Sequence, residues 1–269
     1  MPSTPRLPRR PYACAAMAEL TLIGGPTALI EYGGLRWLTD PTLSPPGQQE
    51  DELTKTTGPA LGADELGQID IVLLSHDEHS DNLDPGGRAF LPLAGGVLTT
   101  AGGAERLAAD PQSSTAHLTG MQPWAEADVG SVHVTAVPAQ HGPPGSEPEV
   151  GEVIGFLLSD GSTRVYVSGD NASVPVAQEI GERAGPIDVA ILFAGAVQIP
   201  GILDGAYLTL SGDRAAQVAE SLGSPIVIPL HFEGWTHFTQ GADQLRSSFA
   251  GYGLSERLRL PERGVPLTF

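Results

Sequence analysis

Two histidines and several carboxylates lie close together in the segment from His76 to Asp84, which reads HDEHSDNLD. The segment directly follows the apolar run 69–74, whose composition is typical of a buried strand. Neutral imidazole and carboxylate groups are ligands for zinc and for other borderline divalent metals. A polar loop at the end of a buried strand brings its side chains to one edge of a sheet, where α/β proteins commonly bind ligands. The segment therefore predicts a metal site without thiolate ligands.

Three further candidate ligands, His141, Asp170 and His231, also follow apolar segments that are typical of strands. These segments are 132–137, 165–169 and 226–230. Each residue alone is weak evidence, because a single histidine or a Ser-Gly-Asp turn has many structural uses. Their joint arrangement at four strand ends favours one shared site.

The order and context of these residues resemble the metallo-β-lactamase fold superfamily of metal-dependent hydrolases, in particular the branch similar to ascorbate-6-phosphate lactonases. The resemblance covers about residues 20–237 and implies an α/β fold, a four-layer αββα sandwich. It also implies two groups of metal ligands, which are His76, His79 and His141 for one ion and Asp81, Asp170 and His231 for the other.

The first motif departs from the pattern of that branch. The branch often reads Ser-His-Asp-His-x-Asp-His-Leu-Asp, whereas residues 75–84 read SHDEHSDNLD and are one residue longer. An extra residue at Glu78 keeps His79 and Asp81 in the family's roles, while an alignment without a gap makes Glu78 the second ligand. Asn82 then stands where the last histidine is expected, and its amide oxygen is a weak donor. The second site should bind metal less tightly, so one or two ions are expected.

The resemblance implies a metal-dependent hydrolase in which metal-bound hydroxide attacks an ester, lactone or phosphoester of a small molecule. A divalent ion lowers the pKa of bound water toward ~7, which supplies hydroxide at neutral pH. Asp81 would orient or deprotonate this water. His237 would donate a proton to the leaving group or contact a substrate anion, with a packed loop histidine as the alternative. Zinc is the expected metal, and manganese and iron are the alternatives.

Two other functions use the same residues. A degenerate, metal-poor scaffold that binds a ligand or partner without turnover is favoured by Asn82, and an oxidoreductase on the same scaffold would need iron. Few basic residues lie near the motifs, which favours neutral esters and lactones over phosphorylated substrates. Three carboxylates, Asp40, Asp77 and Asp84, are candidates either to hold a ligand histidine or to serve as turn residues.

Composition limits the classes of partner. The formal charge of −18 repels nucleic acids, and the sequence has no run of apolar residues long enough to cross a membrane. Cys14 is the only cysteine, so an intramolecular disulfide is excluded and an oxidising compartment gains no support. We therefore expect a cytoplasmic protein with a small-molecule substrate, no nucleic-acid partner and no membrane partner. The sequence is compatible with a monomer or a homo-oligomer.

The chain divides into two parts of different character. Residues 1–16 are rich in proline and arginine without a periodic apolar pattern, which predicts a disordered extension. Residues 17–269 are expected to form one metallo-β-lactamase-like domain. Within it, the patterns predict two helices. The segment 173–184 mixes apolar and charged positions and ends at Gly185, and the segment 211–222 starts with a good N-cap and ends at Gly223.

Overall fold

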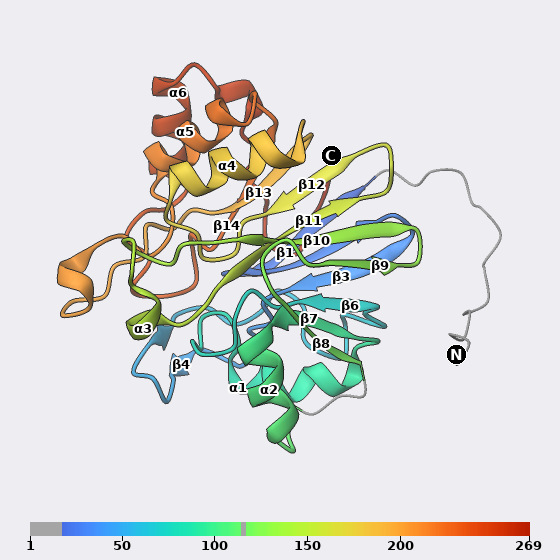
Figure 1. Ribbon diagram of the computed structural model, residues 1–269. Coiled ribbons are helices and arrows are strands. Elements are labelled where there is room, and N and C mark those ends of the chain that lie inside the picture. The colour runs from blue at the N-terminus through green and yellow to red at the C-terminus, as the bar shows by residue number, and fades with distance from the viewer. Residues whose placement is uncertain (1–17, 114–116) are drawn as a thin grey trace.

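The computed structural model describes residues 18–113 and 117–269, and most of its strands belong to two packed sheets (Figure 1). The strand order is β15-β1-β2-β3-β6-β7-β8 in the first sheet and β14-β13-β12-β11-β10-β9 in the second, and β4 and β5 form a separate ribbon. The predicted extension, residues 1–16, lies outside the described residues.

The strands of the first sheet and of the ribbon are Glu19–Gly24 (β1), Thr27–Tyr32 (β2), Leu35–Thr39 (β3), Gly47–Gln48 (β4), Thr54–Lys55 (β5), Ile71–Leu73 (β6), Val97–Thr100 (β7), Leu118–Met121 (β8) and Pro266–Thr268 (β15). Those of the second sheet are Glu126–Val129 (β9), Val132–Pro138 (β10), Ile154–Ser159 (β11), Arg164–Val167 (β12), Val189–Phe193 (β13) and Ile226–Leu230 (β14). The α-helices are Pro85–Phe90 (α1), Ala101–Ala109 (α2), Glu147–Val150 (α3), Val174–Ala184 (α4), Gly212–Ser221 (α5) and Ala242–Gly251 (α6), and the 3₁₀ turns are Leu91–Leu93 (η1), Leu203–Gly205 (η2) and Ser255–Arg257 (η3).

Alternation along the strands divides the apolar side chains between two cores. In β2, Ala28 and Ile30 join the core between the sheets, while Leu29 joins the core under helices α1 and α2. Helices α4, α5 and α6 cover the outer face of the second sheet, at the top of Figure 1, and α1 and α2 lie below the first sheet. The predicted four-layer αββα sandwich is confirmed.

Strand direction determines where the predicted ligands converge. Strands β12, β13 and β14 are parallel, and β10 runs in the same direction as β12 because both are antiparallel to β11. The carboxyl ends of β10, β12 and β14 therefore lie at one edge of the second sheet. In the first sheet, β6 is parallel to β3 and β7.

Both predicted helices occur where the capping signals placed them. The side chain of Ser173 accepts a hydrogen bond from Val176 N at the start of α4, and that of Ser211 accepts one from Arg214 N at the start of α5. Gly185 ends α4 with a φ of 79°. Among the helices of the described ranges, none has the length and apolar character that a membrane crossing requires.

Candidate metal centre

The loop after β6 folds into tight turns between strand β6 and helix α1. The amides of Asn82 and Leu83 both donate to the carbonyl of His79, at 3.1 and 2.9 Å. Asp84 then caps helix α1, because its Oδ1 accepts from Gly87 N at 2.8 Å. This anchoring fixes the loop at both ends, by a strand before it and a helix after it.

Three imidazoles from two loops converge in the first ligand group. The nearest nitrogens of His76, His79 and His141 all lie within 4.8 Å of one another, and His76 Nε2 is 3.0 Å from His79 Nδ1. His76 and His141 are buried, and His79 is half-buried. The geometry is that of three ligands around one point.

Outer-ring hydrogen bonds set the orientation of two of these imidazoles. His141 Nδ1 donates to the carbonyl of Leu208 at 2.8 Å, and His76 Nδ1 lies 2.9 Å from Ser75 Oγ. A histidine ligand commonly has its second nitrogen held in this way, which leaves the other nitrogen free to bind metal. His141 Nε2 is buried and has no hydrogen-bond partner.

The second ligand group contains two carboxylates and one imidazole. Candidate ligand atoms of Asp81, Asp170 and His231 lie within 4.8 Å of one another. His231 Nε2 is 3.2 Å from Asp81 Oδ2 and 3.7 Å from Asp170 Oδ1. All three side chains are buried. His237 joins from the C-terminal side, with its Nε2 2.8 Å from Asp81 Oδ2.

The geometry distinguishes between the two alignments of the first motif. The ring centroid of His79 lies 4.9 Å from that of His76 and 5.2 Å from that of His141. Glu78 is directed elsewhere, since its Oε2 pairs with Arg106 Nη2 at 3.0 Å. The structure therefore brings His79 into the cluster and leaves Glu78 outside it.

Buried atoms without partners test whether a metal fits here. His141 Nε2, Asp170 Oδ2, Asn82 Oδ1 and both ring nitrogens of His231 are buried without a hydrogen-bond partner. Each unsatisfied polar atom costs roughly 1–3 kcal/mol, so such a concentration needs a compensating partner. Divalent cations are the partner that imidazole and carboxylate donors share. The donor set fits such an ion.

The protonation states agree with this fit. Burial lowers the pKa of His76 well below its usual range and that of His141 to about 3, so both rings are neutral, as a ligand must be. Burial and the neighbouring Asp81 and Asp40 raise the pKa of Asp170 well above its usual range. Burial also opposes the ionisation of Asp81, but His237 and His231 outweigh it and hold the pKa of Asp81 well below its usual range.

The three candidate supporting carboxylates have roles other than holding a ligand histidine. Asp40 accepts from the backbone nitrogen of Ser75 at 2.6 Å, so it positions the chain before His76 rather than a ring N–H. Burial raises the pKa of Asp40 to about 8. Asp77 pairs with Arg106 at 2.6 Å, and Asp84 both caps α1 and pairs with a buried lysine.

Backbone geometry at His231 depends on two glycines that the sequence analysis did not identify. His231 has a φ of 59°, and its N–H donates to the carbonyl of Gly25 at 2.8 Å. A β-carbon on Gly195 would lie 2.0 Å from the carbonyl oxygen of His231, so only glycine fits there. Gly195 follows the buried strand β13 and could be seen in the sequence, but no sequence signal placed it against the carbonyl of His231.

A cavity of about 170 Å³ opens onto both ligand groups. His79, Asp81 and His141 form part of its wall. The rest of the wall is largely apolar and consists of Leu53, Val150, Val197, Ile199, Ile202 and Leu208. These side chains belong to segments without any recognised motif, so only the tertiary structure identifies them.

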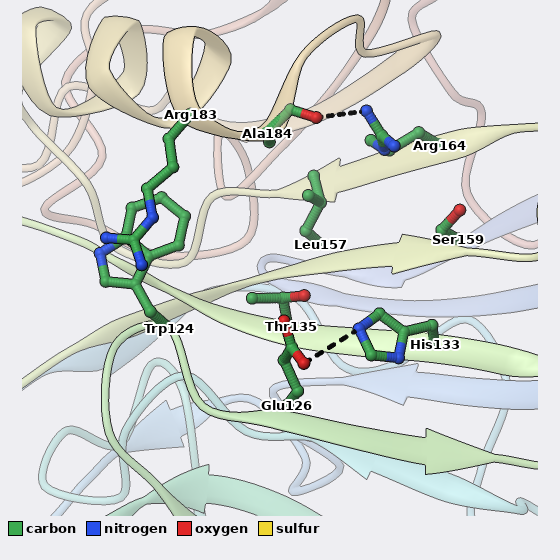
Figure 2. A pocket seen from close by; sticks show the side chains of 9 residues that line it. All are labelled: Trp124, Glu126, His133, Thr135, Leu157, Ser159, Arg164, Arg183 and Ala184. Atoms are coloured by element: carbon green, nitrogen blue, oxygen red, sulfur yellow. Dashed lines mark hydrogen bonds and ion pairs between the residues drawn. The ribbon is translucent and has the colours of Figure 1, made fainter.

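A larger cavity, of about 290 Å³, lies on the second sheet beside α4 and contains no predicted ligand (Figure 2). Arg183 stacks on Trp124 with 3.8 Å between its guanidinium carbon and the ring centroid. Arg164 donates to the carbonyl of Ala184 at the end of α4, and His133 lies 3.7 Å from Glu126. Its charged side chains contact an aromatic ring, a backbone carbonyl or each other, and none of the predicted ligands lies there.

Comparison with known proteins agrees with this geometry. Residues 36–232 match the model of the beta-lactamase superfamily domain, which is most of the chain. The chain belongs to this family. A UPF0173 metal-dependent hydrolase from Pyrococcus furiosus is 25% identical over 221 residues, which cover 81% of this chain and 86% of the relative. The prediction of a metal-dependent hydrolase is thus confirmed at the level of the family.

Solved structures of the same fold extend over nearly the whole chain. A possible metal-dependent hydrolase from Veillonella parvula superposes with a TM-score of 0.82 at 17% identity, covering 94% of this chain and 100% of the other. An isothiocyanate hydrolase from Delia radicum gut bacteria superposes with a TM-score of 0.79 at 17% identity, covering 93% and 98%. At this identity the likeness shows the fold of the family.

Proposed function

We propose that this chain hydrolyses an ester, lactone or phosphoester of a small molecule with the help of one or two divalent ions, zinc first among them. The observation that carries the proposal is the concentration of unpartnered, buried nitrogen and oxygen atoms beside a cavity. His76, His79 and His141 would hold the first ion. Asp81, Asp170 and His231 would hold the second, and the amide oxygen of Asn82 would be a weak additional donor beside them.

A divalent ion in such a site lowers the pKa of a coordinated water toward ~7 and polarises the oxygen of the scissile group. The protein's own contribution centres on Asp81, which lines the cavity and is held ionised by its histidine neighbours. In the proposed reaction, Asp81 orients the attacking water and accepts its proton. Its Oδ2 lies 3.2 Å from His231 Nε2 and 2.8 Å from His237 Nε2.

His237 fits a positioning role better than direct proton donation to the leaving group. Its Nε2 is occupied by Asp81 at 2.8 Å, its Nδ1 is buried without a partner, and it does not line the described cavity. The side chain is 7% exposed. We therefore assign His237 a positioning role, in which it fixes the orientation of the Asp81 carboxylate and keeps it ionised.

The resemblance of the motifs to ascorbate-6-phosphate lactonases supports testing esters and lactones first. The acidic charge of −18 and the scarcity of cysteine support action in the cytoplasm on a small molecule, without nucleic acid or membrane as partner. A metal-poor scaffold without turnover is the second candidate, and Asn82 is the observation in its favour.

The test is steady-state hydrolysis of p-nitrophenyl acetate, γ-butyrolactone and p-nitrophenyl phosphate by protein purified without chelator. Asp81→Asn should lower kcat by roughly 10²–10⁴-fold, the usual contribution of a general base. Asp128→Asn is the matched control, because Asp128 is an exposed carboxylate on β9 whose ion-pair partner within the described residues is His133. Unchanged turnover after chelation, or in Asp81→Asn, would contradict the proposal and favour the binding scaffold.

A further inference from the structure

One side of the cavity beside the ligand groups is an apolar wall, defined here as Val150, Val197, Ile199, Ile202 and Leu208. Val150, Val197 and Leu208 form a small core separate from the two main cores. Ile199 and Ile202 pack against it and remain partly exposed. Partly exposed isoleucines that face a cavity are available for contact with an apolar group.

The apolar wall is tied to the candidate ligands by the backbone. The carbonyl of Leu208 accepts from His141 Nδ1 at 2.8 Å, so this wall residue and a candidate ligand are fixed relative to each other. Leu208 N donates to Val197 O at 2.9 Å, and Val197 N donates to Thr209 Oγ1 at 3.0 Å. A group lying on the wall would therefore be presented to the candidate metal site in a set orientation.

The charges around this cavity have one sign. Asp51 and Glu149, both exposed, line it along with Asp81, and the described lining contains neither lysine nor arginine. Arg106, which lies near the first motif, is already paired with Asp77 and Glu78. A phosphate or carboxylate on the distal part of a substrate would meet carboxylates without a compensating cation.

We infer that the substrate of this site carries a small, uncharged aliphatic group that lies on the apolar wall, and that anionic and phosphorylated substrates are discriminated against. The inference rests on the proposed hydrolase function and narrows its substrate class to neutral esters and lactones. The cavity of about 170 Å³ beside the apolar wall favours a short aliphatic group.

A series of p-nitrophenyl esters from acetate to hexanoate tests the apolar wall. In the unmodified protein, kcat/KM should rise roughly threefold to fourfold for each added methylene until the cavity is filled. The anionic p-nitrophenyl succinate and p-nitrophenyl phosphate should be poorer substrates than the neutral butyrate. A flat chain-length series, or a preference for either anionic substrate, would overturn the inference.

Two variants of Ile202 sharpen the test. Ile202→Ala should flatten the chain-length series, and Ile202→Lys should lower kcat/KM for the hexanoate and raise it for the succinate. Leu93→Ala is the matched control, since Leu93 is an apolar side chain that is 70% exposed in η1 and lies outside the cavity. Thermal unfolding of each variant separates loss of folding from loss of contact. Equal effects of Ile202→Ala and Leu93→Ala on the series would overturn the inference.

A binding measurement distinguishes failure of this inference from failure of the proposed function. In methyl-labelled protein, titration with 2-hexanone, an uncharged compound that hydrolysis cannot consume, should shift the methyl signals of Ile199 and Ile202. Inorganic phosphate should leave these signals in place. Shifts with 2-hexanone, combined with no turnover of any ester, would refute the hydrolase and support the neutral ligand class. Shifts with phosphate alone would overturn the inference.

Discussion

The side-chain nitrogen of Asn82 donates a hydrogen bond to Asp170 Oδ1 across 3.2 Å. The two residues come from different sheets, Asn82 from the loop after β6 and Asp170 from the loop after β12, and both are buried. Asn82 stands where the motif predicted from the resemblance would have an imidazole. Its amide positions Asp170, while its own Oδ1 has no hydrogen-bond partner. The chain thus has a weaker donor at the second ligand group.

Asn82→His should therefore strengthen metal binding at the second group. An imidazole is a better ligand than an amide oxygen, so we expect affinity for the weaker ion to rise by about 10-fold or more. Competition with a fluorescent zinc chelator measures this affinity. Asn82→Ala is the matched variant and should lower the affinity for the same ion, because it removes both the amide oxygen and the hydrogen bond to Asp170. Equal zinc affinity in all three proteins would contradict this account.

Metal content should depend separately on the two ligand groups. We expect about two zinc equivalents in the unmodified protein and about one in each of His76→Ala and His231→Ala. Elemental analysis of protein purified without chelator gives these values. His133→Ala, which removes a half-exposed histidine outside both groups, should keep the full content. Loss of zinc in His133→Ala, or retention in both other variants, would refute the assignment.

Replacement of His237 should affect turnover more than substrate binding. His237→Phe removes the donor to Asp81 Oδ2, and we expect kcat to fall roughly 10–100-fold with KM changed much less. His237→Gln offers an N–H in its place and should restore part of the loss. Steady-state kinetics on the best ester of the panel measures both parameters. Equal losses in both variants would indicate a merely structural role.

Gly195→Ala should disturb the second ligand group from outside it. Its β-carbon would lie 2.0 Å from the carbonyl oxygen of His231, so the backbone of His231 must shift, and zinc content and thermal stability should both fall. Gly251→Ala, at the end of α6, is the control because its β-carbon would meet no atom within 4 Å. That change should be neutral or slightly stabilising. Equal behaviour of the two variants would argue against this packing constraint.

The ion pair between Lys55 and Asp84 should be essential for stability. Lys55 Nζ lies 3.0 Å from Asp84 Oδ2, both side chains are buried, and burial lowers the pKa of Lys55. Lys55→Met leaves a buried carboxylate without its cation, which costs about 3–5 kcal/mol of unfolding free energy. Urea unfolding measures this cost. Arg246→Met, which breaks the exposed pair with Asp243, should cost less than about 1 kcal/mol; comparable costs would contradict the argument.

The sequence supported correct predictions wherever local signals were sufficient. Strands β6, β10, β12 and β14 were visible as apolar runs, and α4 and α5 through their capping residues, because these signals involve neighbours in the chain. The αββα sandwich was implied by the resemblance of the motifs to the metallo-β-lactamase superfamily. The family's motif spacing also suggested which histidines and aspartates to group.

The tertiary structure determined what depends on residues far apart in sequence. His79 rather than Glu78 enters the first group because Arg106, on α2, pairs with Glu78. Asp40 serves the backbone of Ser75, and Gly195 makes room for the carbonyl of His231.

By itself, the sequence determined the strands, the capped helices and the set of candidate ligands, because periodicity, capping and motifs are encoded locally along the chain. The fold class and the family followed from the resemblance that these motifs carry. Only the tertiary structure determined the apolar wall, the acidic lining of the cavity and the pairing of His237 with Asp81. These features join segments that carry no common motif. Their contacts arise from how the two sheets pack, and packing over such separations leaves no local pattern to read.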